Sequence, residues 1–170
     1  MLIVMAGLAG AGKSSVAVGL GRKLAAPVVS VDPIEAAMWR AGVGRGEPTG
    51  LAAYVVTETV ADGVLALGQT VIVDAVNAVE AARGQWRSLA KRHRVPLAFI
   101  EVVCSDPAAH RRRLEGRSRG IEGFVEPTWE AVERQREAFA PWADHRLVLD
   151  SVVDLSSNVA TALEFVAATS

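Results

Sequence analysis

Residues 7–14 read GLAGAGKS and follow the apolar run LIVM at residues 2–5. They complete the pattern GxxxxGK(S/T), in which glycines allow a tight turn and successive backbone N–H groups point inward to bind an anion. A helix that begins near residue 14 adds the positive end of its dipole. We therefore predict that the phosphates of a nucleotide bind along this loop, at Gly7, Leu8, Ala9, Gly10, Ala11, Gly12, Lys13, Ser14 and Ser15.

Two side chains of the loop carry specific chemistry. In this pattern the lysine, Lys13, reaches the β- and γ-phosphates, and the hydroxyl of Ser14 ligates Mg²⁺. ATP and Mg²⁺ are therefore the predicted cofactors. The alternative, a glycine-rich turn that binds nothing, is disfavoured because a strand pattern precedes the motif and a helical pattern follows it.

The remainder of the chain alternates short apolar runs with longer amphipathic stretches. We predict strands at Leu2–Met5, Pro27–Val31, Thr70–Val73, Leu97–Val103 and Arg146–Leu149. Helical patterns lie at about 14–25, 33–41, 51–67, 79–93, 107–117, 128–140 and 156–168. Such alternation favours right-handed crossovers and an α/β fold with a parallel sheet covered on both faces. At 170 residues, a single domain spanning 1–170 is expected.

Composition agrees with this fold and excludes several protein classes. Hydrophobic residues make up 51% of the chain, with 29 Ala and 25 Val, whereas aromatic residues make up only 5%. Small and β-branched side chains suit helices packed closely over buried parallel strands. A disordered chain, a collagen-like repeat and a disulfide scaffold are excluded.

Charge and cysteine content narrow the partners and the compartment. The formal net charge is −1, so no overall field draws the protein to nucleic acid or to an anionic membrane. Fifteen of the 18 basic residues are Arg, which leaves a local phosphate-binding patch open. Cys104 is the single cysteine, and no uncharged apolar stretch approaches the roughly 18 residues that span a membrane. We expect a cytoplasmic protein, a monomer or a homodimer, with no membrane association.

Two carboxylates follow predicted strands. Ligands of an open parallel sheet bind beyond the carboxyl ends of its strands, where Asp32 and Asp74 are expected to lie. Asp74 is a candidate ligand of Mg²⁺, or else a polar residue at a strand end. Asp32 is a candidate general base, or else the N-cap of a helix that starts at Pro33. Asn77 either orients a phosphate or substrate or makes a turn.

An arginine cluster follows the fourth strand. Arg113 and Arg117 are four residues apart on a predicted helix and are expected to share a face. We predict that they belong to a mobile lid, about residues 112–127, which also holds Arg119 and closes over the charge of a transferring phosphoryl group. The alternative is a solvated basic face paired with nearby glutamates. Further candidate substrate contacts are Arg40, Arg45 and Arg83.

Four segments together resemble the small P-loop kinases of the nucleoside-monophosphate-kinase-like class: GLAGAGKSS, VVSVDPIEAA, VIVDAVNAVEAARGQWRSLAKR and EVVCSDPAAHRRRLEGR. This class includes gluconate, shikimate and adenylylsulfate kinases, chloramphenicol phosphotransferase, the kinase domain of polynucleotide 5′-kinases and AAA_33-type kinases. The third segment is most similar to the polynucleotide-kinase pattern. In one departure, no second carboxylate lies two residues from Asp32, which leaves the acceptor undefined.

The resemblance implies a five-stranded parallel sheet in the order 2-3-1-4-5 and MgATP as the phosphoryl donor. It also implies that Asp32 acts as the base, that Arg113 and Arg117 act from the lid, and that adenine lies near Arg113 against Asp150–Asp154. The expected function is an ATP-dependent phosphotransferase that acts on a hydroxyl of a small molecule. The alternatives are a polynucleotide 5′-hydroxyl kinase and a regulatory nucleotide-binding ATPase without kinase activity.

Overall fold

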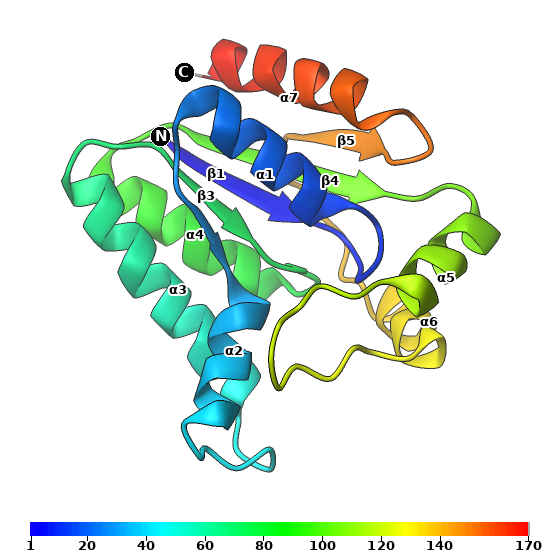
Figure 1. Cartoon of the computed structure of the whole chain (residues 1–170). Coiled ribbons are helices and arrows are strands. Elements are labelled where there is room, and N and C mark those ends of the chain that lie inside the picture. The colour runs from blue at the N-terminus through cyan, green and yellow to red at the C-terminus, as the bar shows by residue number, and fades with distance from the viewer. Residues whose placement is uncertain (170) are drawn as a thin grey trace.

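A five-stranded, all-parallel sheet in the order β2-β3-β1-β4-β5 forms the centre of the structure, a computed structural model that describes residues 1–169 (Figure 1). The strands are β1 (Leu2–Ala6), β2 (Val28–Ser30), β3 (Val71–Asp74), β4 (Leu97–Val103) and β5 (Arg146–Asp150). The helices are α1 (Lys13–Leu24), α2 (Val31–Arg40), α3 (Thr49–Ala66), α4 (Glu80–His93), α5 (Pro107–Gly116), α6 (Trp129–Glu137) and α7 (Leu155–Thr169). The predicted fold class and strand order are confirmed.

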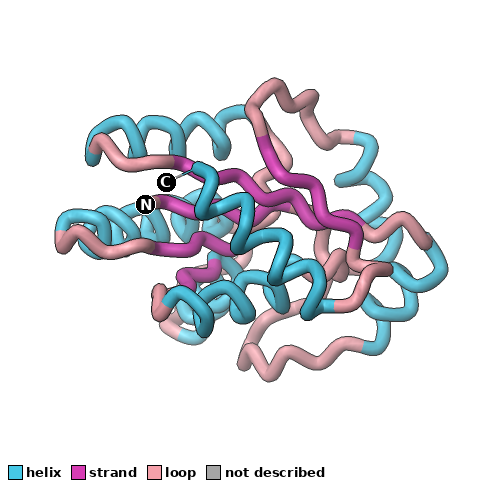
Figure 2. The backbone as a smooth tube through the Cα atoms, turned by 90° about the horizontal axis from the view of Figure 1, so that it is seen from above, coloured by secondary structure: helices cyan, strands magenta, loops and turns pink. Residues whose placement is uncertain are grey.

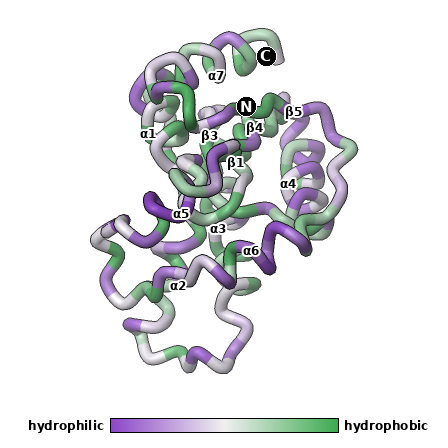
Figure 3. The backbone as a smooth tube through the Cα atoms, turned by 90° about the vertical axis from the view of Figure 1, so that its right-hand side faces the viewer, coloured by the Kyte–Doolittle hydropathy of each residue, from purple (hydrophilic) through white to green (hydrophobic). Residues whose placement is uncertain are grey.

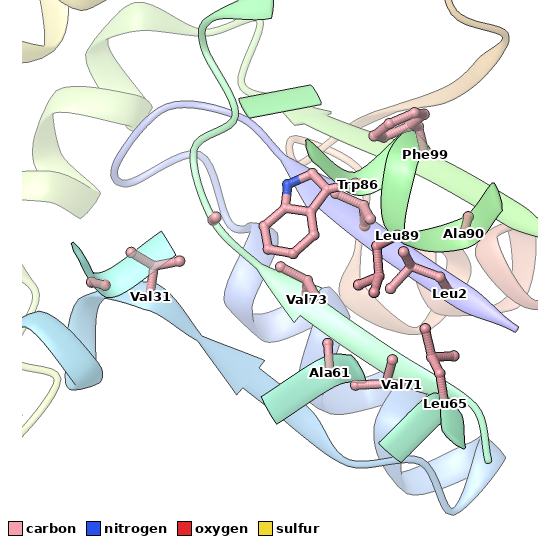
Figure 4. Packing of buried hydrophobic residues seen from close by; sticks show 13 residues of the cluster. Leu2, Val31, Ala61, Leu65, Val71, Val73, Trp86, Leu89, Ala90 and Phe99 are labelled. Carbon is pink, nitrogen blue, oxygen red and sulfur yellow. The ribbon is translucent and has the colours of Figure 1, made fainter. Parts of the chain in front are cut away.

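Helices cover both faces of the sheet, as the end-on view in Figure 2 shows. Alternate residues of a strand face opposite sides, so Leu2 and Val4 of β1 pack with α3 and α4, whereas Ile3 and Met5 pack with α1 and α7. Trp86 of α4 is fully buried against the first of these faces (Figure 4). None of the helices within residues 1–169 is both long enough and apolar enough to cross a membrane.

The small side chains allow α1 to approach its neighbours closely. A Cβ atom at Gly19 would lie 2.5 Å from the Val159 side chain of α7, and one at Gly21 would lie 2.8 Å from Val28 of β2. Separations under 3 Å require a neighbour to move. Glycine at positions 19 and 21 is therefore a requirement of the packing on this face.

The beginning of α2 corrects one prediction. The helix begins at Val31, and Ser30 is its N-cap residue, so Asp32 lies in the first turn and does not cap the helix. Proline is tolerated at Pro33 because the first N–H groups of a helix have no partner within it. Asp106, which also precedes a proline, does cap its helix, since its carboxylate accepts hydrogen bonds from two amides of α5.

The end of α5 corrects a second prediction, that Arg113 and Arg117 share a helical face. The helix ends at Gly116, and Arg117 has an extended backbone (φ −80°, ψ 140°), so Arg113 and Arg117 do not share a helical face. The chain from residue 117 to residue 127 contains no helix or strand before α6 begins. In Figure 1 this segment crosses beneath the carboxyl end of the sheet toward α2.

Replacing Gly7 by alanine is expected to lower the free energy of unfolding by at least about 2 kcal/mol. The residue has φ +132°, and a Cβ atom there would lie 2.2 Å from the Val102 carbonyl oxygen of β4. Gly63→Ala is the matched control, because Gly63 lies within α3 with nothing within 4 Å of an added Cβ. The control is expected to raise stability by about 0.5–1 kcal/mol. Urea unfolding measures both, and equal stability of Gly7→Ala and the unmodified protein would contradict the analysis.

Candidate nucleotide and phosphoryl-transfer site

The GLAGAGKS loop bends over the carboxyl end of β1. Gly7, Gly10 and Gly12 have positive φ, and the amide of Gly7 donates to the Val76 carbonyl oxygen at 3.1 Å. Lys13 begins α1 and is 5% exposed. A cavity of about 260 Å³ lies above the loop and is lined by Gly10, Gly12, Lys13, Ser14, Ser15, Arg113, Arg117 and Arg119. Helix N-terminal amides and four cationic side chains thus surround one space, which suits a polyphosphate.

The two carboxylate oxygens of Asp74 differ in their hydrogen bonding within the described residues. The side chain belongs to a residue 6% exposed, and its Oδ2 accepts a hydrogen bond from the Ser30 hydroxyl at 3.2 Å. Its Oδ1 is buried and has no hydrogen-bond partner within residues 1–169. A buried carboxylate oxygen without a partner is costly unless an ion or water meets it. Together with the hydroxyl of Ser14, this donor set fits Mg²⁺, a cation that takes oxygen ligands.

A magnesium ion at Ser14 and Asp74 would need further ligands from a nucleotide or from water. Among the described residues 1–169, no group of three or more His, Cys, Asp or Glu side chains could hold a metal by itself. Mg²⁺ commonly keeps one or two protein ligands and takes the others from phosphates and water. Two protein ligands, Ser14 and Asp74, agree with this coordination preference.

Asp32 is held by an arginine of the irregular segment. Its Oδ2 accepts a hydrogen bond from Nη1 of Arg119 at 2.6 Å. Arg119 also forms two hydrogen bonds with the carboxylate of Glu126, at 2.8 and 3.0 Å, and Glu126 forms an ion pair with Arg117. Four charged side chains thus link α2 to the segment between α5 and α6.

The two arginines of this network differ electrostatically. Burial lowers the pKa of Arg119, but hydrogen bonds to Glu126 and Asp32 outweigh it, so the pKa is raised overall. Burial and the neighbouring charge of Arg119 lower the pKa of Arg117, and its Nε is buried with no hydrogen-bond partner within the described chain. An anion in the cavity would provide a hydrogen-bond acceptor for this arginine.

Arg113 lies beside a second cavity. Its guanidinium donates to the Ser151 hydroxyl at 2.8 Å and to the Ser151 carbonyl oxygen at 3.1 Å. The adjoining cavity, about 310 Å³, is lined by Gly12, Ser15, Val16, Arg113, Ser151, Val152, Val153, Asp154, Leu155 and Asn158. It lies between the phosphate loop and the segment after β5, where the family resemblance locates adenine; adenine binding there stays a prediction.

Arg40 and Arg45 contact the irregular segment and do not line the phosphate cavity. Arg40 donates to the Glu122 carbonyl oxygen and Arg45 to that of Gly123, each at 2.8 Å. Arg45 also lies over the Trp39 ring, 4.3 Å from its centroid. These arginines tie residues 117–127 to the end of α2, and a direct substrate contact by either stays a prediction.

Asn77 and Arg83 are structural, which corrects their prediction as substrate contacts. Asn77 is fully buried; its Nδ2 donates to the Met5 carbonyl oxygen, and its Oδ1 accepts from the Trp86 indole, each at 2.8 Å. Arg83 is also fully buried and donates to the carbonyl oxygens of Ala140 and Pro141. Neither side chain is available to a bound molecule in this arrangement.

His110 supports the phosphate loop, a role that the sequence did not indicate. The residue is 1% exposed, and its Nε2 lies 2.8 Å from the Ala9 carbonyl oxygen. Since a carbonyl only accepts, Nε2 carries the proton, and Nδ1 accepts from Arg136 at 3.1 Å. Burial is the main reason that the pKa of His110 is lowered. The neutral ring thereby fixes the middle of the loop.

The stability of the protein should fall in mildly acidic solution because of this histidine. Unfolding releases His110 to its ordinary pKa of 6.5, so the unfolded chain takes up a proton that the folded protein resists. The free energy of unfolding should be fully retained above about pH 6.5 and decline toward pH 5, by at most about 1.4 kcal/mol per pH unit for one group. His110→Gln should flatten this decline, and identical slopes in urea titrations of both proteins would contradict the assignment.

Comparison with known proteins agrees with the geometry. Kti12 of Chaetomium thermophilum, in complex with ADP-AlF3, is 21% identical with a TM-score of 0.76, covering 99% of this chain and 98% of that chain. A gluconokinase from Sinorhizobium meliloti 1021 is 18% identical with a TM-score of 0.71, covering 97% and 90%. APS kinase CysC of Mycobacterium tuberculosis, in complex with AMPPNP and APS, is 19% identical with a TM-score of 0.67, covering 98% and 96%.

No curated protein matches the chain. Residues 2–142, which include the phosphate loop, Asp32, Asp74 and the arginines of the cavity, match the AAA domain family AAA_33. The chain therefore belongs to the AAA_33 family of AAA domains and has the fold of P-loop kinases.

Proposed function

We propose that the protein transfers the γ-phosphoryl group of MgATP to a hydroxyl group of a small molecule. The observation that carries the proposal is the gathering of the loop, Lys13 and three arginines around one cavity, with Asp32 bonded to one of those arginines. Phosphoryl transfer needs positioning of the reactants, neutralisation of charge on the phosphates, and a base near the acceptor hydroxyl.

Each group has a distinct part in this proposal. Lys13 and the loop amides bind the phosphates. Ser14 and Asp74 hold Mg²⁺, which neutralises negative charge on the phosphates when it is bound. Asp32 accepts the proton of the acceptor hydroxyl. The acceptor oxygen forms a bond to the γ-phosphorus as the bond from that phosphorus to the β-phosphate oxygen breaks, and ADP leaves with the electron pair.

Arg119 connects Asp32 with the phosphates. In the present arrangement its guanidinium neutralises Asp32, and it also lines the phosphate cavity. A γ-phosphate competes for the same donors, since arginine binds phosphate and carboxylate with similar geometry. Transfer of Arg119 from Asp32 to the phosphate would free the carboxylate when ATP is present.

A second candidate is a nucleotide-binding ATPase that acts through a partner protein. The Asp32–Arg119 ion pair favours it, because a carboxylate held by an arginine is not free to contact an acceptor hydroxyl. The two functions differ in one measurement: a kinase releases ADP in proportion to an added acceptor, and the ATPase releases it without one. The cytoplasmic location and the oligomeric state stay predictions.

A polynucleotide acceptor is less well supported. It would require a free basic channel for the phosphates of the strand. Arg111 is instead paired with Glu115, and Arg87 with both Glu80 and Asp144. Acceptor-dependent turnover that falls steeply with salt would nonetheless identify an oligonucleotide substrate.

Lys13→Ala is expected to remove nucleotide binding. MgATP at 100 times its Kd should stabilise the unmodified protein by about 2.7 kcal/mol, and this increment should vanish in the variant. Lys91→Ala, at the exposed end of α4, is the matched control and should retain it. Thermal-shift titration measures the increment, and full stabilisation of Lys13→Ala would contradict the role of the loop.

Asp32→Asn is expected to abolish phosphoryl transfer, at least about 100-fold in kcat, because the amide cannot accept the proton. The affinity for MgATP should not fall, since Asp32 does not line the phosphate cavity and the amide competes less with the γ-phosphate for Arg119. Asp62→Asn on α3, where the carboxylate pairs with Arg92 and His93, is the control and should turn over normally. Unchanged turnover of Asp32→Asn would overturn its assignment as the base.

A further inference from the structure

A cavity of about 330 Å³ lies between α3, the start of α4 and α6, apart from the phosphate cavity. We call it the α3–α4–α6 cavity. Its size is at the lower end of the range for small-molecule sites. Its walls include Leu51, Tyr54, Val76, Ala82, Gln85 and Gln135, and none of its lining side chains is charged.

Two hydrogen bonds connect the walls of the α3–α4–α6 cavity to the phosphate loop and to the segment after β3. The carbonyl oxygen of Val76 accepts the amide of Gly7, so this wall continues into the phosphate loop. The Tyr54 hydroxyl accepts a hydrogen bond from the Asn77 amide, three residues beyond Asp74. Burial, with a contribution from Asp32 and Asp74, raises the pKa of Tyr54 to about 12, so both carboxylates act on this ring.

A carboxylate on α2 also borders the cavity. A Cβ atom at Gly50, a lining residue, would lie 3.6 Å from Oε1 of Glu35, which is one helical turn beyond Asp32. The partner of this oxygen is the hydroxyl of Thr49, at 2.8 Å, a neutral group. The charged group next to Gly50, behind this end of the cavity, is therefore an anion.

The arginines of α4 do not offset that charge. Arg83 is fully buried and donates to two carbonyl oxygens in the segment before β5. Arg87 is paired with Glu80 and Asp144. An anionic molecule in the cavity would lose hydration without gaining a cation from α4. An apolar molecule would instead bury surface against Leu51, Val76 and Ala82.

From this juxtaposition we infer that the α3–α4–α6 cavity binds the phosphoryl acceptor, and that the acceptor is an uncharged hydroxyl compound with an apolar or aromatic body. The inference rests on the proposed function and specifies its substrate class. Sugar acids, nucleotides and polynucleotide ends are excluded as preferred acceptors. Gln85 and Gln135 supply the neutral polar contacts that orient a hydroxyl-bearing molecule.

Three probes separate charge from apolar area. 4-Nitrophenyl β-D-glucopyranoside is uncharged and aromatic, 4-nitrophenyl β-D-glucuronide differs from it by one carboxylate, and methyl β-D-glucopyranoside lacks the aromatic ring. Binding of each to the full chain is measured by calorimetry without nucleotide, so the readout does not depend on catalysis. The glucopyranoside with the aromatic ring should bind at least about tenfold more tightly than either of the others.

Two pairs of variants locate the binding. Ala82→Phe fills the cavity and should lower the affinity for the aromatic glucopyranoside at least about tenfold. Ala168→Phe, at an exposed position of α7 across the sheet, should leave this affinity unchanged. Gln135→Arg adds a cation and should raise the affinity for the glucuronide relative to the glucopyranoside. Gln135→Leu is its uncharged control and should leave that ratio in favour of the glucopyranoside. Stabilisation by MgATP confirms that each variant is folded.

The outcomes separate this inference from the proposed function. Three results would overturn the acceptor assignment. The glucuronide could bind as tightly as the aromatic glucopyranoside, none of the three probes could bind, or folded Ala82→Phe could keep its affinity for the aromatic glucopyranoside. Glucopyranoside binding that Ala82→Phe abolishes supports the site even where no ADP is released. Absence of ADP release with a bound acceptor and bound MgATP counts against the kinase activity alone.

Discussion

The contact of Gly7 with the backbone of β4 is the constraint on which the rest of the site depends. No side chain fits between residue 7 and the Val102 carbonyl oxygen, so the chain can turn there at the end of β1. The amide of Gly7 bonds to Val76 beyond β3, and Asp74 pairs in register with Met5 of β1. The phosphate loop and the proposed metal ligand are thus fixed to neighbouring strands.

The helices add a second level of support to the loop. His110 of α5 holds the Ala9 carbonyl oxygen, and Arg136 of α6 holds the other side of the imidazole ring. Much of α5 and α6 has the colour of hydrophilic residues in Figure 3. Leu114 of α5 and Val132 of α6 are nevertheless buried in a small cluster with Ala9 of the loop. The geometry that binds phosphate is therefore maintained by contacts between residues about 100 positions apart.

The charged network at the mouth of the cavity sets the resting state of the proposed base. Asp32 and Glu126 form ion pairs with Arg117 and Arg119, two of the four cationic side chains that line the phosphate cavity. A bound polyphosphate provides a stronger partner for Arg117 and Arg119 than either carboxylate. Nucleotide binding and release of Asp32 are then linked, which would limit proton abstraction to the loaded enzyme.

Local sequence patterns predicted the parallel sheet and the phosphate loop, because each depends on periodicity or on a contiguous motif. The order of the strands followed only from the family resemblance. The contacts of residues 117–127 were harder to predict from the sequence, since the partners of Arg119 are 7 and 87 residues away along the chain. Asn77 and Arg83 resemble ligands in sequence, and only their buried partners at Met5 and in the segment before β5 show them to be structural. Tyr54 gave no signal because its role comes from the packing of α3.

The central claim is that the γ-phosphoryl group reaches a hydroxyl group and not water. ³¹P NMR of the unmodified protein with MgATP and 4-nitrophenyl β-D-glucopyranoside tests this most directly. A phosphomonoester resonance that grows in equal amount with ADP is the predicted result. Formation of ADP with inorganic phosphate alone, at saturating glucopyranoside, would contradict it.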